Sequence, residues 1–311
     1  MARCKIPLRI VNGFILILSC FLTGCIPPSD RNIIFPDRDI VYQANDGETY
    51  QLGFVNEDGK DVILFSTHEL RVTEPIWSLD KSMIYFRTIV REHPGVENQN
   101  RSGYIGMLKN SDTPRAACEN ILFPTDRLVP THDNTIVLAS EGSVLGLIDL
   151  AQCEWRKIIV SSEEGFCSYA LSTDETTVLY SERHENKCMI QSMHLETGEI
   201  NSLGEGRSAT YSPDDKKIAF IRPDGIYVMD RNGENMNELI HFRAVLHESR
   251  NYYEIPTMPE WSPDGKWLVY HKCITQDGLC ETSDDFQIFK LSIANGSEIL
   301  LIEQGLNPSW R

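Results

Sequence analysis

A unit of about ten residues, present six times, constrains the fold of this chain more than any other feature. Its two best copies are residues 261–270 (WSPDGKWLVY) and 211–220 (YSPDDKKIAF). Residues 171–180 and 77–86 repeat the pattern, and two shorter copies precede Tyr42 and Leu138. The central aspartates of the six copies are Asp37, Asp80, Asp133, Asp174, Asp214 and Asp264. Pro, Asp and Gly favour a tight turn, and the apolar residues after it favour a buried strand, so each copy predicts strand–turn–strand.

The spacing of these units predicts how the strands are grouped. Successive aspartates lie 40 to 53 residues apart, which is the length of one four-stranded propeller blade. A second hairpin follows several copies, marked by Asp58-Gly59, Thr197-Gly198, Asn232-Gly233 and Asn295-Gly296. We therefore expect an all-β chain that forms a six-bladed β-propeller of four-stranded antiparallel blades.

The pattern Ser-Pro-Asp-Gly-Lys…Leu-Val-Tyr, with Ile-Tyr-Val-Met-Asp…Asn-Gly, resembles the repeats of TolB-like β-propellers. The resemblance covers residues 33–311 and implies the propeller fold. Residues 308–311 (PSWR) repeat the start of residues 259–262 (PEWS) and would begin a further copy that residues 36–42 continue. The expected closure joins strands from both termini, and residues 33–35 (IIF) are the alternative source of the closing strand.

The first 25 residues predict export and lipid anchoring. Arg3, Lys5 and Arg9 precede an apolar stretch that ends in Leu22-Thr23-Gly24-Cys25, which has the layout of a secretory signal. The ending resembles the lipobox of bacterial lipoproteins, in which the cysteine thiol is acylated. We interpret residues 1–24 as the signal peptide, Cys25 as the lipid attachment site and residues 25–32 as a tether. An ordinary signal peptide or a transmembrane anchor are the alternatives.

Charge excludes some partners. The chain has 29 Lys and Arg residues and 45 Asp and Glu residues. Residues 1–24 hold three of the basic residues and none of the acidic ones, so the rest of the chain has 26 basic and 45 acidic residues and a net charge of −19. Nucleic-acid binding needs the opposite balance. A basic patch on anionic lipid is equally disfavoured, so acyl chains would hold the membrane. We expect a monomer.

Six cysteines remain once Cys4, Cys20 and Cys25 are set aside, namely Cys118, Cys153, Cys167, Cys188, Cys273 and Cys280. In an exported chain they permit disulfides, with 15 possible connectivities. Cys273 and Cys280 enclose a short polar segment and form the most plausible local bridge. Free buried thiols are the alternative.

The sequence contains none of the G-x-S-x-G, H-E-x-x-H or phosphate-loop patterns. We therefore predict no catalytic residue, metal or cofactor and take the protein not to be an enzyme. The repeated aspartates are interpreted as turn caps. Long inserts at residues 87–102, 241–259 and 275–285 are candidate binding loops.

The predicted function is a lipid-anchored protein-binding scaffold of the bacterial cell envelope, on the periplasmic face of the outer membrane or on the cell surface. One alternative is a metal-dependent lyase or hydrolase that uses histidines near the axis, of which His271 and His184 are candidates. Another is a small-ligand or glycan sensor that uses the central funnel.

Overall fold

The computed structural model describes residues 37–45, 50–65, 71–89, 103–109, 115–118, 128–141, 143–185, 187–242, 257–273 and 285–311. These residues belong to one compact unit, Ile33–Arg311. The described chain contains no helix with the length and apolarity that a membrane crossing requires.

The described strands form six antiparallel sheets of four strands each. The first is ordered β24 (Leu306–Trp310), β1 (Ile40–Asn45), β2 (Tyr50–Val55) and β3 (Ile63–Phe65). The second holds β4 (Arg71–Trp77), β5 (Met83–Ile89), β6 (Gly103–Lys109) and β7 (Arg115–Cys118). The third holds β8 (Val129–Pro130), β9 (Ile136–Glu141), β10 (Val144–Asp149) and β11 (Glu154–Ser161).

The other three sheets follow the same order. The fourth holds β12 (Phe166–Leu171), β13 (Thr177–His184), β14 (Lys187–His194) and β15 (Ile200–Glu205). The fifth holds β16 (Arg207–Tyr211), β17 (Lys217–Arg222), β18 (Gly225–Asp230) and β19 (Asn237–His241). The sixth holds β20 (Thr257–Trp261), β21 (Trp267–Cys273), β22 (Phe286–Ser292) and β23 (Glu298–Ile302).

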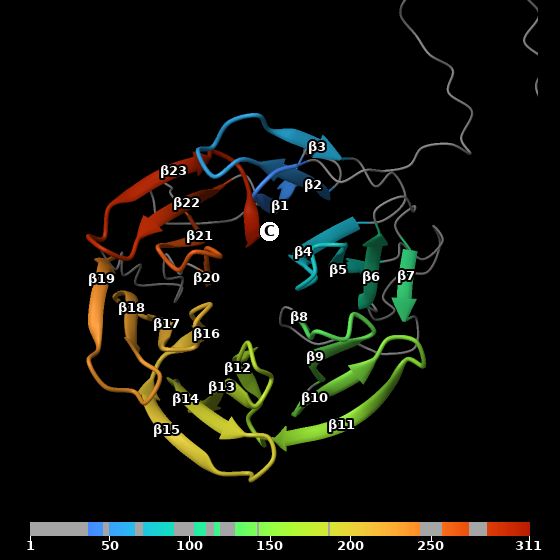
Figure 1. Ribbon diagram of the computed structural model, residues 1–311, viewed down its shortest axis with the longest axis vertical. Helices are drawn as coiled ribbons and strands as arrows, with labels where there is room; N and C mark the ends of the chain where they lie inside the picture. The colour runs from blue at the N-terminus through green and yellow to red at the C-terminus, as the bar shows by residue number, and fades with distance from the viewer. Residues whose placement is uncertain are drawn as a thin grey trace, which may run out of the picture. The chain divides into compact units, whose positions relative to one another are not determined.

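The sheets stand around a central axis, with β4, β8, β12, β16, β20 and β24 innermost (Figure 1). This arrangement confirms the expected all-β propeller with four-stranded antiparallel blades. β24 pairs with β1, with Trp310 opposite Ile40, and β24 also contacts β20 and β4. Residues 33–35, the alternative closing strand, lie outside the described residues.

The apolar core is divided among the joints between sheets. Each of six clusters of buried residues joins two neighbouring sheets. On β17, Ile218 and Phe220 enter the cluster shared with the fourth sheet, whereas Ala219 and Ile221 enter the cluster shared with the sixth. Successive side chains of a strand point to opposite faces, so a continuous apolar run is what a sheet packed on both faces requires.

Candidate binding site at the propeller axis

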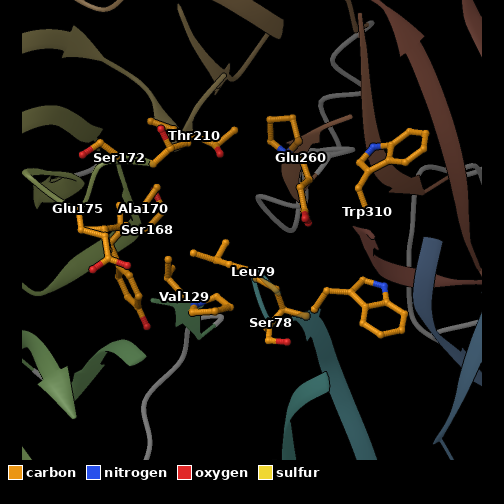
Figure 2. Close-up of a pocket in the computed structure, with 18 of the residues that line it drawn as sticks. Ser78, Leu79, Val129, Ser168, Ala170, Ser172, Glu175, Thr210, Glu260 and Trp310 are labelled. Carbon is orange, nitrogen blue, oxygen red and sulfur yellow. The ribbon is translucent and has the colours of Figure 1, made fainter. Parts of the chain in front are cut away.

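A pocket of about 290 Å³ lies at the axis, where the inner strands end in the repeated turns. Every inner strand contributes to its lining. Figure 2 shows Val129 of β8, Ala170 of β12, Thr210 of β16 and Glu260 of β20 around the same space. Ser78 and Leu79, from the turn that follows β4, complete this side of the mouth.

The lining combines apolar and hydroxyl side chains with four charged ones, Lys81, Glu175, Glu260 and Arg311. Its uncharged part consists of Pro, Ala, Val, Leu, Ile and aromatic side chains together with Ser and Thr. Glu260 is held at the wall because Ser309 Oγ donates a hydrogen bond of 3.0 Å to its Oε1. Leu79 is 49% exposed beside the mouth. Such a surface offers apolar contact and hydrogen bonds together, which is typical of a binding pocket.

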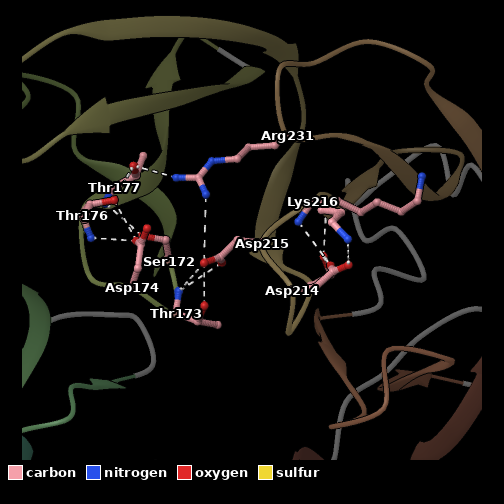
Figure 3. Close-up of polar contacts among 11 residues, drawn as sticks. Ser172, Thr173, Asp174, Thr176, Thr177, Asp214, Asp215, Lys216 and Arg231 are labelled. Atoms are coloured by element: carbon pink, nitrogen blue, oxygen red, sulfur yellow. Dashed lines mark hydrogen bonds and ion pairs between the residues drawn. The ribbon is translucent and has the colours of Figure 1, made fainter.

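The repeated aspartates fix the turns that form the mouth. In the copy at Asp174, Ser172 Oγ donates to Asp174 Oδ1 at 2.7 Å and the Thr176 amide donates to the same oxygen at 3.0 Å (Figure 3). The Thr177 amide in turn donates to Ser172 Oγ at 2.9 Å. The same Ser–Asp bond occurs at Ser78–Asp80, Ser212–Asp214 and Ser262–Asp264. These bonds confirm turn capping by Asp80, Asp174, Asp214 and Asp264, and the Thr135 amide donates to Asp133 Oδ1 at 3.0 Å in the same way. Asp37 differs, because its carboxylate accepts a hydrogen bond of 3.1 Å from Arg311 Nη1.

Electrostatics follow from this geometry. Hydrogen bonds from Ser172 and then Thr176 lower the pKa of Asp174 to about 2. Hydrogen bonds from Ser262 and then the Lys266 amide lower the pKa of Asp264 to about 2. Donors directed at a carboxylate stabilise its charged form. The lowered pKa values therefore describe carboxylates committed to their own turns.

Neighbouring turns are also bonded to one another. The Thr173 amide donates to Asp215 Oδ1 at 3.0 Å, and Thr173 Oγ1 donates to Oδ2 at 2.5 Å (Figure 3). Arg231 donates to Thr177 Oγ1 at 2.9 Å, and its guanidinium lies 5.1 Å from the centre of the Tyr211 ring. These contacts tie the fourth sheet to the fifth at the edge of the pocket.

At the joint between the third and fourth sheets, a backbone amide of one turn again donates to a carboxylate of the next turn. The His132 amide donates to Glu175 Oε1 at 2.5 Å, and His132 Nδ1 lies 2.8 Å from that oxygen. Asp215 and Glu175 occupy the same turn position, directly after the capping aspartate. Both have positive φ angles, 54° and 56°. These hydrogen bonds link three successive sheets along this side of the rim.

The predicted site residues have different outcomes. Cys25 and Cys280 lie outside the described residues, so lipidation and the Cys273–Cys280 bridge stay predictions, although Cys273 is disulfide-bonded. His271 is buried and accepts a hydrogen bond of 3.0 Å from the Asn307 amide through Nδ1. His184 lies 3.6 Å from Glu182 at the surface. Within the described ranges, no three His, Cys, Asp or Glu side chains gather as a metal site needs.

Two disulfides were not predicted. Cys167 pairs with Cys188 inside the fourth sheet, and Cys118 pairs with Cys153 across the joint between the second and third sheets. The alternative of free buried thiols is therefore wrong for these four residues. Cys153 has a φ of 55° in the β10–β11 turn, where the first, fourth, fifth and sixth sheets carry Gly59, Gly198, Gly233 and Gly296. The three candidate binding loops lie largely outside the described residues.

No protein-family model and no curated protein matches the chain. Among solved structures, TolB from Acinetobacter baumannii superposes with a TM-score of 0.65 at 18% identity, covering 88% of this chain and 66% of that one. The chain has a TolB-like propeller fold. A chain assigned to TolB of Agrobacterium tumefaciens superposes with a TM-score of 0.61 at 17% identity, covering 87% of this chain and 91% of its own.

The same fold extends to more distant proteins. A chain of the nidogen/laminin complex superposes with a TM-score of 0.64 at 8% identity, covering 88% of this chain and 97% of that one. At sequence identities of 8–18%, these similarities show a shared propeller fold and nothing further. The chain spans 66% of the length of the A. baumannii protein.

Proposed function

We propose that this protein is a cell-envelope lipoprotein whose closed, six-bladed propeller binds a protein partner at the axial pocket. The observation that carries the proposal is the pocket itself, to which every inner strand contributes and whose lining is mainly apolar and hydroxyl groups. Exposed Leu79 beside its mouth adds apolar surface that would be covered in a complex. A segment of polypeptide with apolar side chains suits this chemistry, because interface centres are apolar and depleted in charge.

A rigid ring would present this pocket without reorganisation. The pairing of β24 with β1 and the apolar cluster that joins Trp310 to Val269 and Ile288 support closure of six blades. Lys290 Nζ also donates to the backbone oxygen of Glu57 at 2.8 Å, which links the sixth sheet to the first. Preorganised surfaces lose less conformational entropy on binding.

Lipid anchoring rests on Cys25 and the segment before it. In the sequence Leu22-Thr23-Gly24-Cys25, the thiol would carry the acyl chains and residues 25–32 would tether the propeller. Substitution Cys25→Ser should block lipidation, and detergent phase partitioning should show that the variant no longer behaves as a processed lipoprotein. A Cys25→Ser protein that still partitions as one would refute the anchoring proposal.

The binding proposal is tested by placing a photo-crosslinking amino acid at Leu79 in cells. The matched control is Leu300, which is 44% exposed on outer strand β23 and lies away from the pocket. We expect a discrete envelope-protein adduct from position 79 and none from position 300. Substitution Thr210→Arg, which places a long charged side chain in the pocket, should remove the adduct without changing the melting temperature substantially.

Three outcomes would contradict this assignment. Identical adducts from both positions would indicate nonspecific proximity. An adduct from position 79 that survives Thr210→Arg would place the contact outside the pocket. Adducts with no protein component would favour a small ligand instead.

A further inference from the structure

A second cavity, of about 350 Å³, lies between the fourth and fifth sheets. The connection from β15 to β16, the β13–β14 hairpin and the β17–β18 turn enclose it. Because strands in each sheet are antiparallel, these connections lie at the end of the sheets opposite the aspartate turns. The cavity is therefore separate from the axial pocket, and the two share no lining residue.

The charge of this cavity is opposite to that of the chain. Four basic side chains line it, against two acidic ones, in a protein of net charge −16. The basic residues are Arg183, Lys187, Arg207 and Arg222, and the acidic residues are Glu185 and Glu205. A cleft lined mainly by one sign of charge concentrates ligands of the opposite sign.

One of the two carboxylates that line the cavity, that of Glu205, is neutralised within the cavity wall. Lys187 Nζ lies 2.9 Å from Glu205 Oε2, which neutralises that carboxylate. Arg222 is held in place because its Nε donates to the Glu205 backbone oxygen at 3.1 Å and its guanidinium lies 5.2 Å from the centre of the Tyr227 ring. These contacts fix the wall, and once the Lys187–Glu205 pair is set aside, three arginines remain against the single carboxylate of Glu185.

Arg207, in inner strand β16, is the residue without compensation. Its Nη2 is buried and has no hydrogen-bond partner, and the residue makes no ion pair with any described side chain. Burial lowers the pKa of Arg207 to about 10, so the guanidinium is still charged at neutral pH. A buried charge without a partner destabilises a fold and calls for an explanation.

We propose that this cavity binds a small oxyanion, the carboxylate or phosphate group of a ligand, with Arg207 as its principal donor. The planar guanidinium offers paired N–H donors that match both groups. Arg222 and Arg183 would add positive charge from the adjoining turns. A volume near 350 Å³ accommodates a small molecule.

The test measures thermal melting of the full-length chain in sodium phosphate or sodium acetate, with sodium chloride at equal ionic strength as the reference. A ligand that binds the folded state raises the melting temperature saturably. We expect such a rise with phosphate or with acetate, and the anion that gives it identifies the group. Arg207→Met should raise the apparent Kd of that anion by about tenfold or more.

The control is Arg156→Met, which makes the same change in net charge at an exposed residue outside this cavity. Arg156→Met should keep the anion response. In chloride alone, Arg207→Met should melt no lower than the natural protein, because it removes an uncompensated buried charge. A lower melting temperature for Arg207→Met in chloride, equal responses in all three salts, or loss of the response in Arg156→Met would each overturn the proposal.

Discussion

Gly296 lies in the β22–β23 turn with a φ of 67°, and a Cβ atom built there would lie 2.3 Å from the backbone oxygen of Leu239 in β19. The glycine thus allows the turn of the sixth sheet to pack against the outer strand of the fifth. Gly198 lies in the corresponding β14–β15 turn with a φ of 72°, yet nothing lies within 4 Å of its Cβ position. The two glycines form a matched pair that separates backbone strain from crowding between sheets.

Alanine at either position adopts a left-handed conformation, which costs roughly 1–2 kcal/mol. At Gly296 the added methyl group must also displace a backbone carbonyl, and overpacking of this kind costs typically about 1–3 kcal/mol. We therefore expect Gly198→Ala to lower the free energy of unfolding by about 1–2 kcal/mol and Gly296→Ala to lower it by about 2–5 kcal/mol. At roughly 2–4 °C per kcal/mol for a domain of this size, the difference is measurable by thermal melting.

Asparagine provides the second control, because it tolerates positive φ better than alanine. Gly198→Asn should melt close to the natural protein, whereas Gly296→Asn should stay destabilised because the carbonyl of Leu239 is still crowded. Equal melting temperatures for Gly198→Ala and Gly296→Ala would refute the packing argument. A larger loss at Gly198 would do so as well.

Three further changes test other joints and turns. Deletion of residues 307–311 removes all of β24 except Leu306, including the buried Trp310. The melting temperature should therefore fall by an amount equivalent to at least about 3–5 kcal/mol, and an unchanged midpoint would show that this part of β24 is dispensable. Cys153→Gly with Cys118→Ala keeps a residue suited to positive φ but removes the cross-link, which should cost about 2–5 kcal/mol, and reducing agent should then affect the variant less than the natural protein. Asp174→Asn should lower the melting temperature at pH 7 but have little effect near pH 2. The pKa of Asp174 is lowered to about 2 in the folded protein, so its carboxylate stabilises the fold above the unfolded pKa of roughly 3.9, and this stability is lost as the pH falls through 2. A difference in melting temperature that stays constant across this pH range would contradict the assigned hydrogen bonds.

The sequence predicts the strands beside the aspartate turns well. β17 and β21 begin three residues after Asp214 and Asp264, as the repeats indicate. Local chemistry is sufficient there, because Ser, Asp and a residue suited to positive φ define the turn by themselves. The repeats also predict where the axial pocket lies, because a propeller brings the same repeat position of each blade to one axis.

Features that depend on contact between sheets were not predicted. The partner of Cys153 is set by which outer strand its turn meets, and spacing along the chain does not contain that information. The inner strands also carry bulges: Glu74, Ser208 and Asn307 have φ angles near 50°, each three residues before an aromatic residue. Proline follows Glu74 and Asn307, which is a usable signal for an irregular strand, but Ser208 lacks it. The unpartnered guanidinium of Arg207 is visible only once its surroundings are known.

At three joints between sheets, the variation among repeats at the rim of the axial pocket has the same physical explanation. At the joint between the fifth and sixth sheets, Pro213 lies 3.8 Å from the Cβ position of Gly265; proline has no amide hydrogen to satisfy, and glycine adopts positive φ without strain. Thr173 and His132 occupy the position of Pro213, directly before a capping aspartate, but each has an amide hydrogen. The turn of the next sheet supplies the acceptor, Asp215 for Thr173 and Glu175 for His132. At these three joints, the residue before one capping aspartate and the residue after the next therefore form a pair. Departures from Ser-Pro-Asp-Gly at Thr173 and Asp215 are thus complementary halves of a contact that fixes one sheet to the next.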